Sequence, residues 1–286
     1  MKINIVTDST SEISQEEAKS LGITVIPLHV EIEGKDYIDG VTISNKEFFS
    51  YLRTAKVLPR TSAINPESFK ETFEKFGKDE QVLAILISSD LSATFQSAVI
   101  AKEQLSDRNI TLWDSRQVTL GLCALVKAAI RYRNAGDDIP TIISKLEEIS
   151  GRMVLEAAFN DLRYLAMGGR MPKAVAKIGS LINLRPIITM KNGKIHMASA
   201  TISMGRAMGH MVKKLKANDV DDSLPRFIAH SDAQNIFDKF RRLVEVSKPD
   251  FPTDNPNFVG ITVGSHAGPG CVGLVYFKKK PEAKNN

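Results

Sequence analysis

The stretch Gln81-Val82-Leu83-Ala84-Ile85-Leu86-Ile87, followed at once by Ser88-Ser89-Asp90-Leu91-Ser92-Ala93-Thr94, decides the fold class of this 286-residue chain. An apolar run without polar alternation is typical of a β-strand that is covered on both faces, as in a parallel sheet. The polar segment that follows lies where this strand ends and the next helix begins. Because open α/β sheets bind ligands at the carboxyl ends of their strands, this junction is also a candidate binding site.

Strand and helix signals alternate on both sides of this junction throughout the first half of the chain. Asn65-Pro66 is typical of a helix start, with asparagine as the cap and proline in the first turn. Ser44 and Glu47 have the spacing of a capping box, which predicts another helix start. The further elements expected here are strands over 2–7, 23–32 and 110–113 and helices over 92–105 and 118–133. Strands separated by such helices predict a mostly parallel sheet flanked by helices.

The second half of the chain has a different pattern. Arg185–Met190 and Ile195–Ala200 flank Asn192-Gly193, and this predicts a β-hairpin because Asn-Gly suits a type I′ turn. The other elements expected here are helices over 203–216 and 233–246 and strands over 226–230, 258–263 and 272–277. Helices packed on hairpin strands indicate a mixed sheet in an α+β arrangement.

These patterns together predict an α/β protein with two domains, over residues 1–155 and 156–286. The length agrees with two domains of about 100–200 residues each. No glycine- or serine-rich linker separates the halves. We therefore expect the two domains to pack together, with a ligand buried between them.

Composition excludes several classes of protein. With 43% hydrophobic and 25% charged residues, the chain has ordinary globular composition and is neither disordered nor fibrous. No apolar run approaches the roughly 20 residues that span a bilayer. The first strand reaches Asp8 too early for a secretory signal, so we expect a cytoplasmic protein. Cys123 and Cys271 have neither a disulfide framework nor zinc spacing.

Charge is distributed unevenly although the net charge is only +5. Residues 1–155 hold 18 Lys and Arg against 22 Asp and Glu, whereas residues 156–286 hold 20 against 11. This asymmetry is typical of a protein whose second half binds an anionic ligand or partner. A solvated surface with the basic tail Lys278–Lys280 would produce the same asymmetry. Zinc-finger spacing and aromatic RNA-binding motifs are absent, so nucleic acid is not expected as a partner.

Two pairs of hydroxyl residues precede predicted helices and are candidate anion ligands. Thr61 and Ser62 lie before the helix that starts at Pro66, where they could cap it or bind an anion. Ser92 and Thr94 open the helix after the buried strand, where their hydroxyls suit a carboxylate or a phosphate. This segment lacks the glycines and the lysine of a nucleotide-binding P-loop.

Two glycine-containing segments supply the remaining candidates. Residues 264–270 contain three glycines and a proline and are expected to form a loop, in which His266 could donate to an anion or act as a base. The segment over 163–170 is expected to be a helix ended by glycine. Arg170, just beyond Gly169, could bind a carboxylate or donate hydrogen bonds to the free carbonyls at the end of the helix. No metal-ligand spacing occurs among the histidines and cysteines, so neither a metal nor a cofactor is predicted.

An ordered set of motifs connects these candidates. Read along the chain, it runs Val6-Thr7-Asp8-Ser9-Thr10, Arg60-Thr61-Ser62, Ser88-Ser89-x-Leu91-Ser92-x-Thr94, Tyr164-Leu165-x-x-Gly168-Gly169-Arg170, Leu184-x-Pro186 and Gly264-x-His266-x-Gly268-Pro269-Gly270. This set resembles the DegV family of bacterial fatty-acid-binding proteins, from residue 5 to about 277. The resemblance implies two α/β domains with a long-chain acyl group buried between or beneath them.

The resemblance also implies roles for individual residues. Ser92, His266 and either Thr61 or Ser62 would hold the fatty acid carboxylate. The supporting or partner-facing residues would be Thr94, Gly169 and Arg170. Members of the family present the carboxylate to a separate ATP-dependent fatty acid kinase, and the acyl phosphate enters phospholipid synthesis. The chain would then have no turnover alone, and its basic half could meet an acidic kinase surface or, transiently, anionic lipid.

Two other functional classes are compatible with the same residues. A stand-alone acyl or phosphoryl hydrolase or transferase would use Ser92 as nucleophile and His266 as base. The sequence favours a binding protein over this enzyme, because no third residue is evident to orient His266 and no Gly-x-Ser-x-Gly elbow occurs. A DNA-binding regulator is the third class, and it would have a steeply salt-dependent affinity for DNA.

Overall fold

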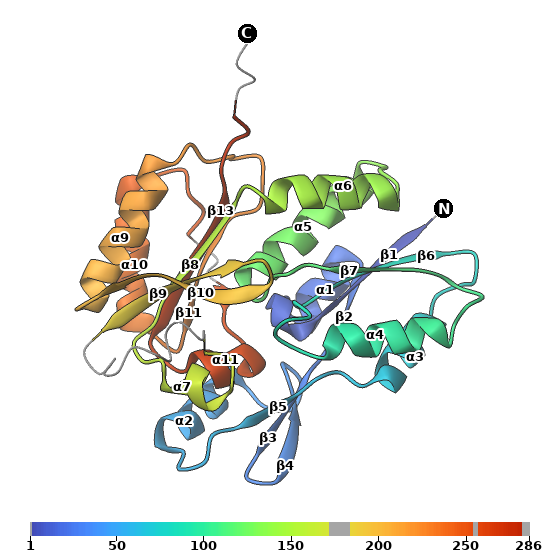
Figure 1. Cartoon of the computed structure of the whole chain (residues 1–286), viewed down its shortest axis with the longest axis horizontal. Helices are drawn as coiled ribbons and strands as arrows, with labels where there is room; N and C mark the ends of the chain where they lie inside the picture. The colour runs from blue at the N-terminus through green and yellow to red at the C-terminus, as the bar shows by residue number, and fades with distance from the viewer. Residues whose placement is uncertain (1, 172–183, 254–256, 282–286) are drawn as a thin grey trace.

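The computed structural model describes residues 2–171, 184–253 and 257–281. Helices and strands in these ranges form three sheets with helices packed on them (Figure 1). Within the same ranges, no helix combines the length and apolar character needed to cross a bilayer.

The first sheet has four parallel strands in the order β2-β1-β6-β7. Its strands are β1 (Ile3–Asp8), β2 (Ile23–Ile26), β6 (Gln81–Leu86) and β7 (Asn109–Asp114). Strand β6 is buried from Val82 to Leu86, because helices cover both faces of the sheet. The helices are α3 (Pro66–Glu74) and α4 (Thr94–Glu103) on one face, and α1 (Gln15–Leu21) and α5 (Leu120–Asn134) on the other. The predicted parallel sheet flanked by helices is confirmed.

The predicted helix caps form as expected from their side-chain chemistry. Ser44 and Glu47 make a reciprocal capping box at the start of α2 (Asn45–Thr54), with Ser44 N–H donating to Glu47 Oε2 at 3.0 Å. Asn65 Oδ1 accepts from the Ser68 N–H at 2.8 Å and starts α3, with Pro66 as the first helical residue.

The second sheet has six strands in the order β10-β9-β8-β13-β11-β12. Its strands are β8 (Met153–Ala158), β9 (Arg185–Lys191), β10 (Lys194–Thr201), β11 (Phe227–Ser231), β12 (Asn257–Phe258) and β13 (Cys271–Phe277). All neighbours are antiparallel except β11 and β12. The β9–β10 hairpin turns through Asn192 and Gly193, both at positive φ, as the Asn-Gly pair predicts.

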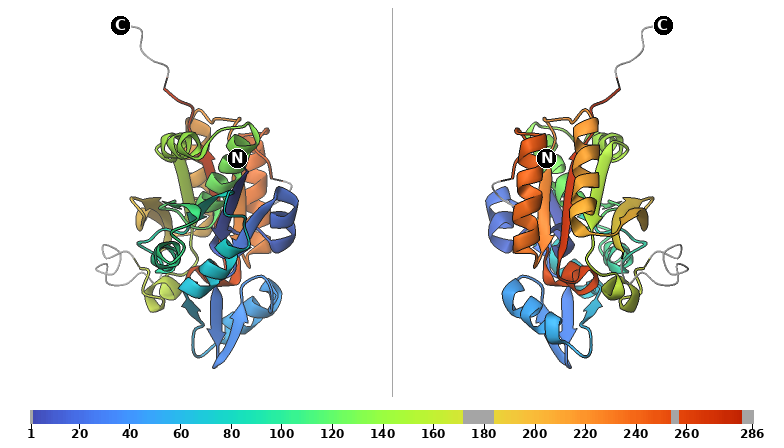
Figure 2. Two further views of the ribbon diagram at one scale, coloured as in Figure 1. Left: turned by 90° about the vertical axis from the view of Figure 1, so that its right-hand side faces the viewer. Right: turned by 90° about the vertical axis from the view of Figure 1, so that its left-hand side faces the viewer.

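Helices α9 (Met204–Ala217) and α10 (Gln234–Ser247) lie side by side on one face of the second sheet (Figure 2). The other face belongs to the largest hydrophobic core, which also includes the inner face of the first sheet. Helix α5 runs through this core, and every residue from Leu120 to Ile130 except Lys127 is buried. The predicted division into domains at residues 155 and 156 falls within β8 and stays a prediction.

A third sheet, which the sequence did not indicate, has three antiparallel strands in the order β4-β3-β5 (Figure 1, bottom). Its strands are β3 (His29–Ile32), β4 (Lys35–Ile38) and β5 (Arg60–Ser62). The single strand expected over 23–32 is therefore wrong. It divides at Pro27, which has no N–H to continue a ladder, into β2 of the first sheet and β3 of the third.

The remaining elements are the 3-10 turn η1 (Ser9–Ser11) and the helices α6 (Ile139–Ser150), α7 (Arg163–Met167) and α11 (Ile261–Ala267). Helix α7 confirms the short helix predicted before Gly168. Helix α11 corrects the prediction of a strand over 258–263 and a loop over 264–270, because only Asn257–Phe258 is a strand and the next turns are helical.

Candidate ligand-binding site

A cavity of about 340 Å³ lies between the first and second sheets. Ligand pockets typically measure 300–1,000 Å³, so the cavity is large enough for a small organic molecule. Its wall is predominantly apolar, with contributions from the second sheet, β5, the start of α5 and residues that follow the strands of the first sheet, such as Ile87. The apolar side chains include Leu28, Ile87, Leu91, Leu155, Phe159 and Ile188.

Five of the seven predicted site residues line this cavity, although they come from distant parts of the chain. They are Thr61 and Ser62 on β5, Ser92 before α4, Arg170 after α7 and His266 on α11. Thr94 and Gly169 do not line it. The wall is thus mostly apolar, and besides these five residues the cavity is also lined by Thr10, Thr119, Thr189, His230 and Thr262.

The His266 imidazole and the Thr61 hydroxyl are in contact with each other. Thr61 Oγ1 lies 2.9 Å from His266 Nε2, although 205 positions separate the two residues. Burial lowers the pKa of His266 to about 4, and the positive charge of Arg170 adds to this effect. The imidazole is therefore neutral at pH 7 and can donate from only one of its nitrogens.

Ser92 is held by Thr94 and does not act as the side-chain cap of α4. The Thr94 N–H donates to Ser92 Oγ at 3.3 Å, and the two hydroxyl oxygens lie 2.9 Å apart. The Ile64 N–H donates to Thr94 Oγ1 at 3.4 Å, which leaves the Thr94 hydroxyl hydrogen for Ser92. Thr94 therefore holds the Ser92 side chain in place.

Ser88 and Ser89, the first residues of the polar segment, have structural partners. Ser88 Oγ donates to the Gly193 carbonyl at 2.7 Å and thereby ties the hairpin turn to the end of β6. Ser89 Oγ donates to Asp114 at 2.6 Å. In this segment only the last part, from Leu91 to Ala93, reaches the cavity.

Arg170 is exposed and also lines the cavity, which places it at the rim. Its guanidinium donates to the Gly168 carbonyl at 2.6 Å and to the Leu91 carbonyl at 3.3 Å. The arginine thus donates to a carbonyl at the end of α7 and connects α7 to the residue that precedes Ser92. Gly169 has a φ of +71° and supplies the left-handed turn between them.

Gly168 and Gly268, which belong to the quoted motifs but were not predicted site residues, set the packing of α7 against α11. A Cβ at Gly168 would overlap His266 Nδ1, and a Cβ at Gly268 would overlap the Tyr164 ring. Each helix therefore ends in a glycine against which a ring of the other helix packs. The glycine-rich motifs contained this signal, but they did not show which ring each glycine faces.

Buried carboxyl groups at the start of α11 were also not predicted. Glu12 Oε2 accepts from the Gly260 N–H at 2.6 Å, and Asp39 Oδ1 accepts from the Ile261 N–H at 3.3 Å. Burial raises the pKa of Glu12 well above its usual range, and the nearby Asp39 charge raises it further. Burial likewise raises the pKa of Asp39. The two carboxyl groups fix the first turn of the helix that carries His266.

The model of the family described as "Uncharacterised protein, DegV family" matches residues 2–279. The chain belongs to the DegV family. A DegV domain-containing protein of Caldanaerobacter subterraneus is 34% identical over 281 residues, which cover 98% of this chain and 99% of the relative. One from Deinococcus radiodurans is 32% identical over 284 residues, covering 96% and 98%.

Solved structures of DegV proteins share the fold over almost the whole chain. A DegV family protein from Thermus thermophilus, described by its fatty acid binding, has a TM-score of 0.86 and 28% identity, covering 98% of this chain and all of that one. DegV from Bacillus subtilis, a fatty acid binding protein, has a TM-score of 0.86, 26% identity and the same coverage. A stearic acid-binding protein from Eubacterium ventriosum has a TM-score of 0.81 and 25% identity, covering 96% and 98%. DegV family proteins therefore bind fatty acids.

Proposed function

We propose that this chain binds a long-chain fatty acid, with the alkyl tail in the cavity and the carboxylate among Thr61, Ser92 and His266. The observation that carries the proposal is a predominantly apolar cavity that is also lined by the contacting pair Thr61 and His266 and by Ser92. Fatty acid binding by the DegV proteins of Thermus thermophilus and Bacillus subtilis supports it.

The tail supplies most of the affinity. A chain of about 15 methylenes, at roughly 0.8 kcal/mol each, gains about 12 kcal/mol on leaving water, before the costs of association. The polar contacts add less free energy, and their role is to fix which end of the ligand reaches the rim.

Two pairs of side chains each provide one hydroxyl group that donates a hydrogen bond to the carboxylate. With the neutral His266 in the tautomer that donates from Nε2 to Thr61 Oγ1, the Thr61 hydroxyl hydrogen is free for the ligand. With Thr94 as the donor in its 2.9 Å contact with Ser92 Oγ, the Ser92 hydrogen is free in the same way. Ser62 lines the cavity beside Thr61 and is the alternative donor. With these donors and the Arg170 charge nearby, the carboxylate stays ionised.

The ionised carboxylate is the form that attacks a phosphoryl group. In this proposal, the chain presents the carboxylate to a separate ATP-dependent fatty acid kinase in the cytoplasm. The sequence carries no P-loop motif that would bind the nucleotide itself. Arg170, exposed at the rim, is placed to meet that partner. The acyl phosphate then serves phospholipid synthesis, with transient contact to a membrane surface.

The geometry favours a binding protein over a stand-alone hydrolase or transferase. A nucleophile–base pair requires a hydrogen bond between the two groups and a third group that orients the base. Within the described residues, the hydrogen bond of the His266 ring goes to Thr61, and its Nδ1 has no hydrogen-bond partner. Ser92 is bonded to Thr94 instead.

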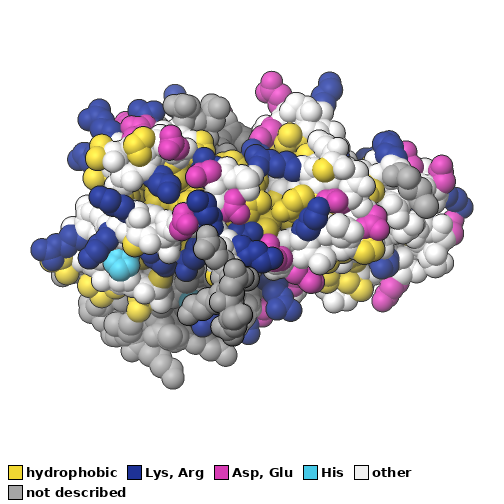
Figure 3. All heavy atoms as spheres, turned by 90° about the horizontal axis from the view of Figure 1, so that it is seen from above, with side chains coloured by type: hydrophobic (Ala, Val, Ile, Leu, Met, Phe, Trp, Pro, Cys, Tyr) yellow, Lys and Arg dark blue, Asp and Glu magenta, His cyan; other side chains and the backbone are white. Residues whose placement is uncertain are grey.

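DNA binding is not supported by the surface seen from above in Figure 3. On the part of that face that the structure describes, acidic and basic side chains are intermixed. A continuous basic stripe, which would follow a phosphate backbone, is not formed there.

A titration with a matched pair of ligands tests the head-group assignment. We expect Ser92→Ala to weaken binding of palmitic acid several-fold and to leave binding of the corresponding fatty alcohol almost unchanged, since the alcohol has no carboxylate. Equal effects on both ligands would show that the carboxylate lies elsewhere. Turnover of acyl esters or acyl phosphates by the purified protein alone would support the hydrolase or transferase.

A further inference from the structure

The three central strands of the second sheet present a row of very small residues to the cavity. Ala157 on β8, Gly273 on β13 and Ala229 on β11 are direct cross-strand partners. All three line the cavity. Since none has a side chain larger than a methyl group, the cavity extends down to the backbone of the sheet along this row.

The next row on the same face of the sheet is made of large residues. Two positions further along each strand, Leu155, Val275 and Phe227 are again cross-strand partners. All three belong to the hydrophobic core around α5, Val275 is fully buried, and of the three only Leu155 reaches the cavity wall. The cavity floor therefore ends where small side chains give way to large ones.

We propose that this row of large residues is the end stop for the alkyl tail, so that Val275 and its neighbours set the longest fatty acid that the chain accepts. The proposal rests on the proposed function. Its physical basis is that the interior is close-packed, so a tail that reaches Val275 can lengthen only by displacing core side chains. The carboxylate, fixed at Thr61 and Ser92, cannot move outward to relieve this.

Matched variants on β13 test the end stop. Val275→Ala removes two methyl groups from the row of large residues just beyond the cavity, whereas Val272→Ala removes the same two groups from the opposite face, where Val272 packs under α9 and α10. The affinities of the wild type and both variants are measured for saturated fatty acids from 12 to 20 carbons. Gly273→Ala is the reverse test, because its new Cβ fills floor space; it lies 3.3 Å from the Glu156 carbonyl oxygen and 3.4 Å from Ala157 Cβ, so a shift of a few tenths of an ångström accommodates it.

For Val275→Ala, we expect the chain length of tightest binding to increase by about two carbons, because the two methyl groups removed have about the volume of two methylene groups. For Gly273→Ala we expect a decrease, and for Val272→Ala no shift. If Val275→Ala and Val272→Ala both keep the wild-type optimum, or if Gly273→Ala does not shorten it, the end stop is wrong. If the wild type binds no member of the series, the proposed function itself fails.

Discussion

His266 and Gly168 illustrate how a single missing side chain can define a binding group. The imidazole packs against the Gly168 backbone while its Nε2 lies 2.9 Å from the Thr61 hydroxyl. Any side chain at position 168 would occupy the space of the ring. The geometry of the proposed carboxylate donors therefore depends on a glycine, because only the lack of a side chain there leaves room for the ring.

We expect Gly168→Ala to weaken palmitate binding about tenfold or more, equivalent to about 1.4 kcal/mol, because His266 must turn away from Thr61. Affinity is measured by titration of the folded variant. Gly209→Ala, in α9, is the matched control, since nothing lies within 4 Å of its new Cβ. Equal affinities for the two variants would show that the packing of His266 on Gly168 has no role in binding.

At the scale of elements, α11 was misassigned because its helical start depends on residues far away in the sequence. The apolar run over 258–263 resembles a strand locally. Its Gly260 and Ile261 amides, however, donate to the side chains of Glu12 and Asp39, which are more than 200 positions earlier. Local patterns cannot contain such a contact. Local patterns did predict the hairpin, because the conformation of the Asn192-Gly193 turn depends only on these two residues.

The Glu12 carboxyl predicts a pH dependence of stability. Its folded-state pKa is raised, so the folded chain binds more protons than the unfolded chain above the usual pKa of glutamate. Stability is therefore greatest at low pH for this group and falls as the pH rises toward the folded pKa. Asp8, whose pKa burial raises to about 6, contributes in the same direction.

In Glu12→Gln, the amide oxygen can still accept from Gly260, and the titrating group is gone. We expect the free energy of unfolding, measured in urea between pH 5 and 8, to fall less steeply with pH in this variant than in the wild type. The depressed pKa of His266 acts in the opposite direction but equally in both proteins, so the difference isolates Glu12. Parallel curves would contradict the assignment of a raised pKa.

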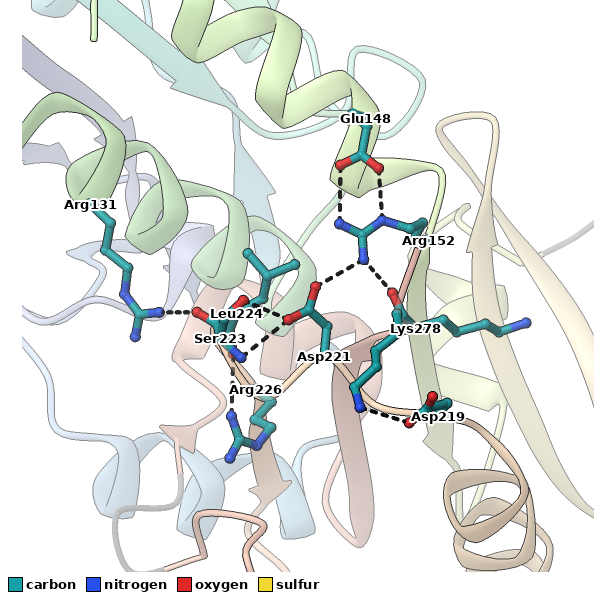
Figure 4. A network of polar contacts seen from close by, with 10 residues as sticks. Arg131, Glu148, Arg152, Asp219, Asp221, Ser223, Leu224, Arg226 and Lys278 are labelled. Atoms are coloured by element: carbon teal, nitrogen blue, oxygen red, sulfur yellow. Dashed lines mark hydrogen bonds and ion pairs between the residues drawn. The ribbon is translucent and has the colours of Figure 1, made fainter. Parts of the chain in front are cut away.

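At the scale of the whole molecule, a polar network ties the first half of the chain to its last strand (Figure 4). Arg152, at the start of β8, bonds both carboxylate oxygens of Glu148 at 2.9 and 3.0 Å and Asp221 at 3.1 Å. It also donates to the carbonyl of Lys278, just after β13. Arg131 on α5 adds a bond to the Ser223 carbonyl at 2.7 Å.

We expect Arg152→Ala to lower the free energy of unfolding by about 1.5–3 kcal/mol, because charge-assisted hydrogen bonds are lost at a side chain that is only 15% exposed. Lys78→Ala, which removes an exposed ion pair with Asp107, should cost less than about 1 kcal/mol. Urea unfolding of both variants checks this. A loss for Arg152→Ala no larger than that for Lys78→Ala would show that the network adds little stability.

The parallel sheet and the mixed second sheet could be predicted from local patterns, whereas the cavity could not. Its polar residues Thr61 and His266 are 205 positions apart, and only the resemblance to the DegV family grouped them. The small row of Ala157, Gly273 and Ala229 depends on the register between strands, which the sequence alone does not specify. The long-range contacts that form the cavity could therefore not be predicted from the sequence.

The most direct test is mass spectrometry of the organic extract from protein incubated with a mixture of fatty acids and purified again without detergent. We expect long-chain fatty acid to be recovered in an amount comparable to that of the protein, with the carboxylate unmodified. Repeated extracts that contain no fatty acid, from protein shown to be folded, would contradict it.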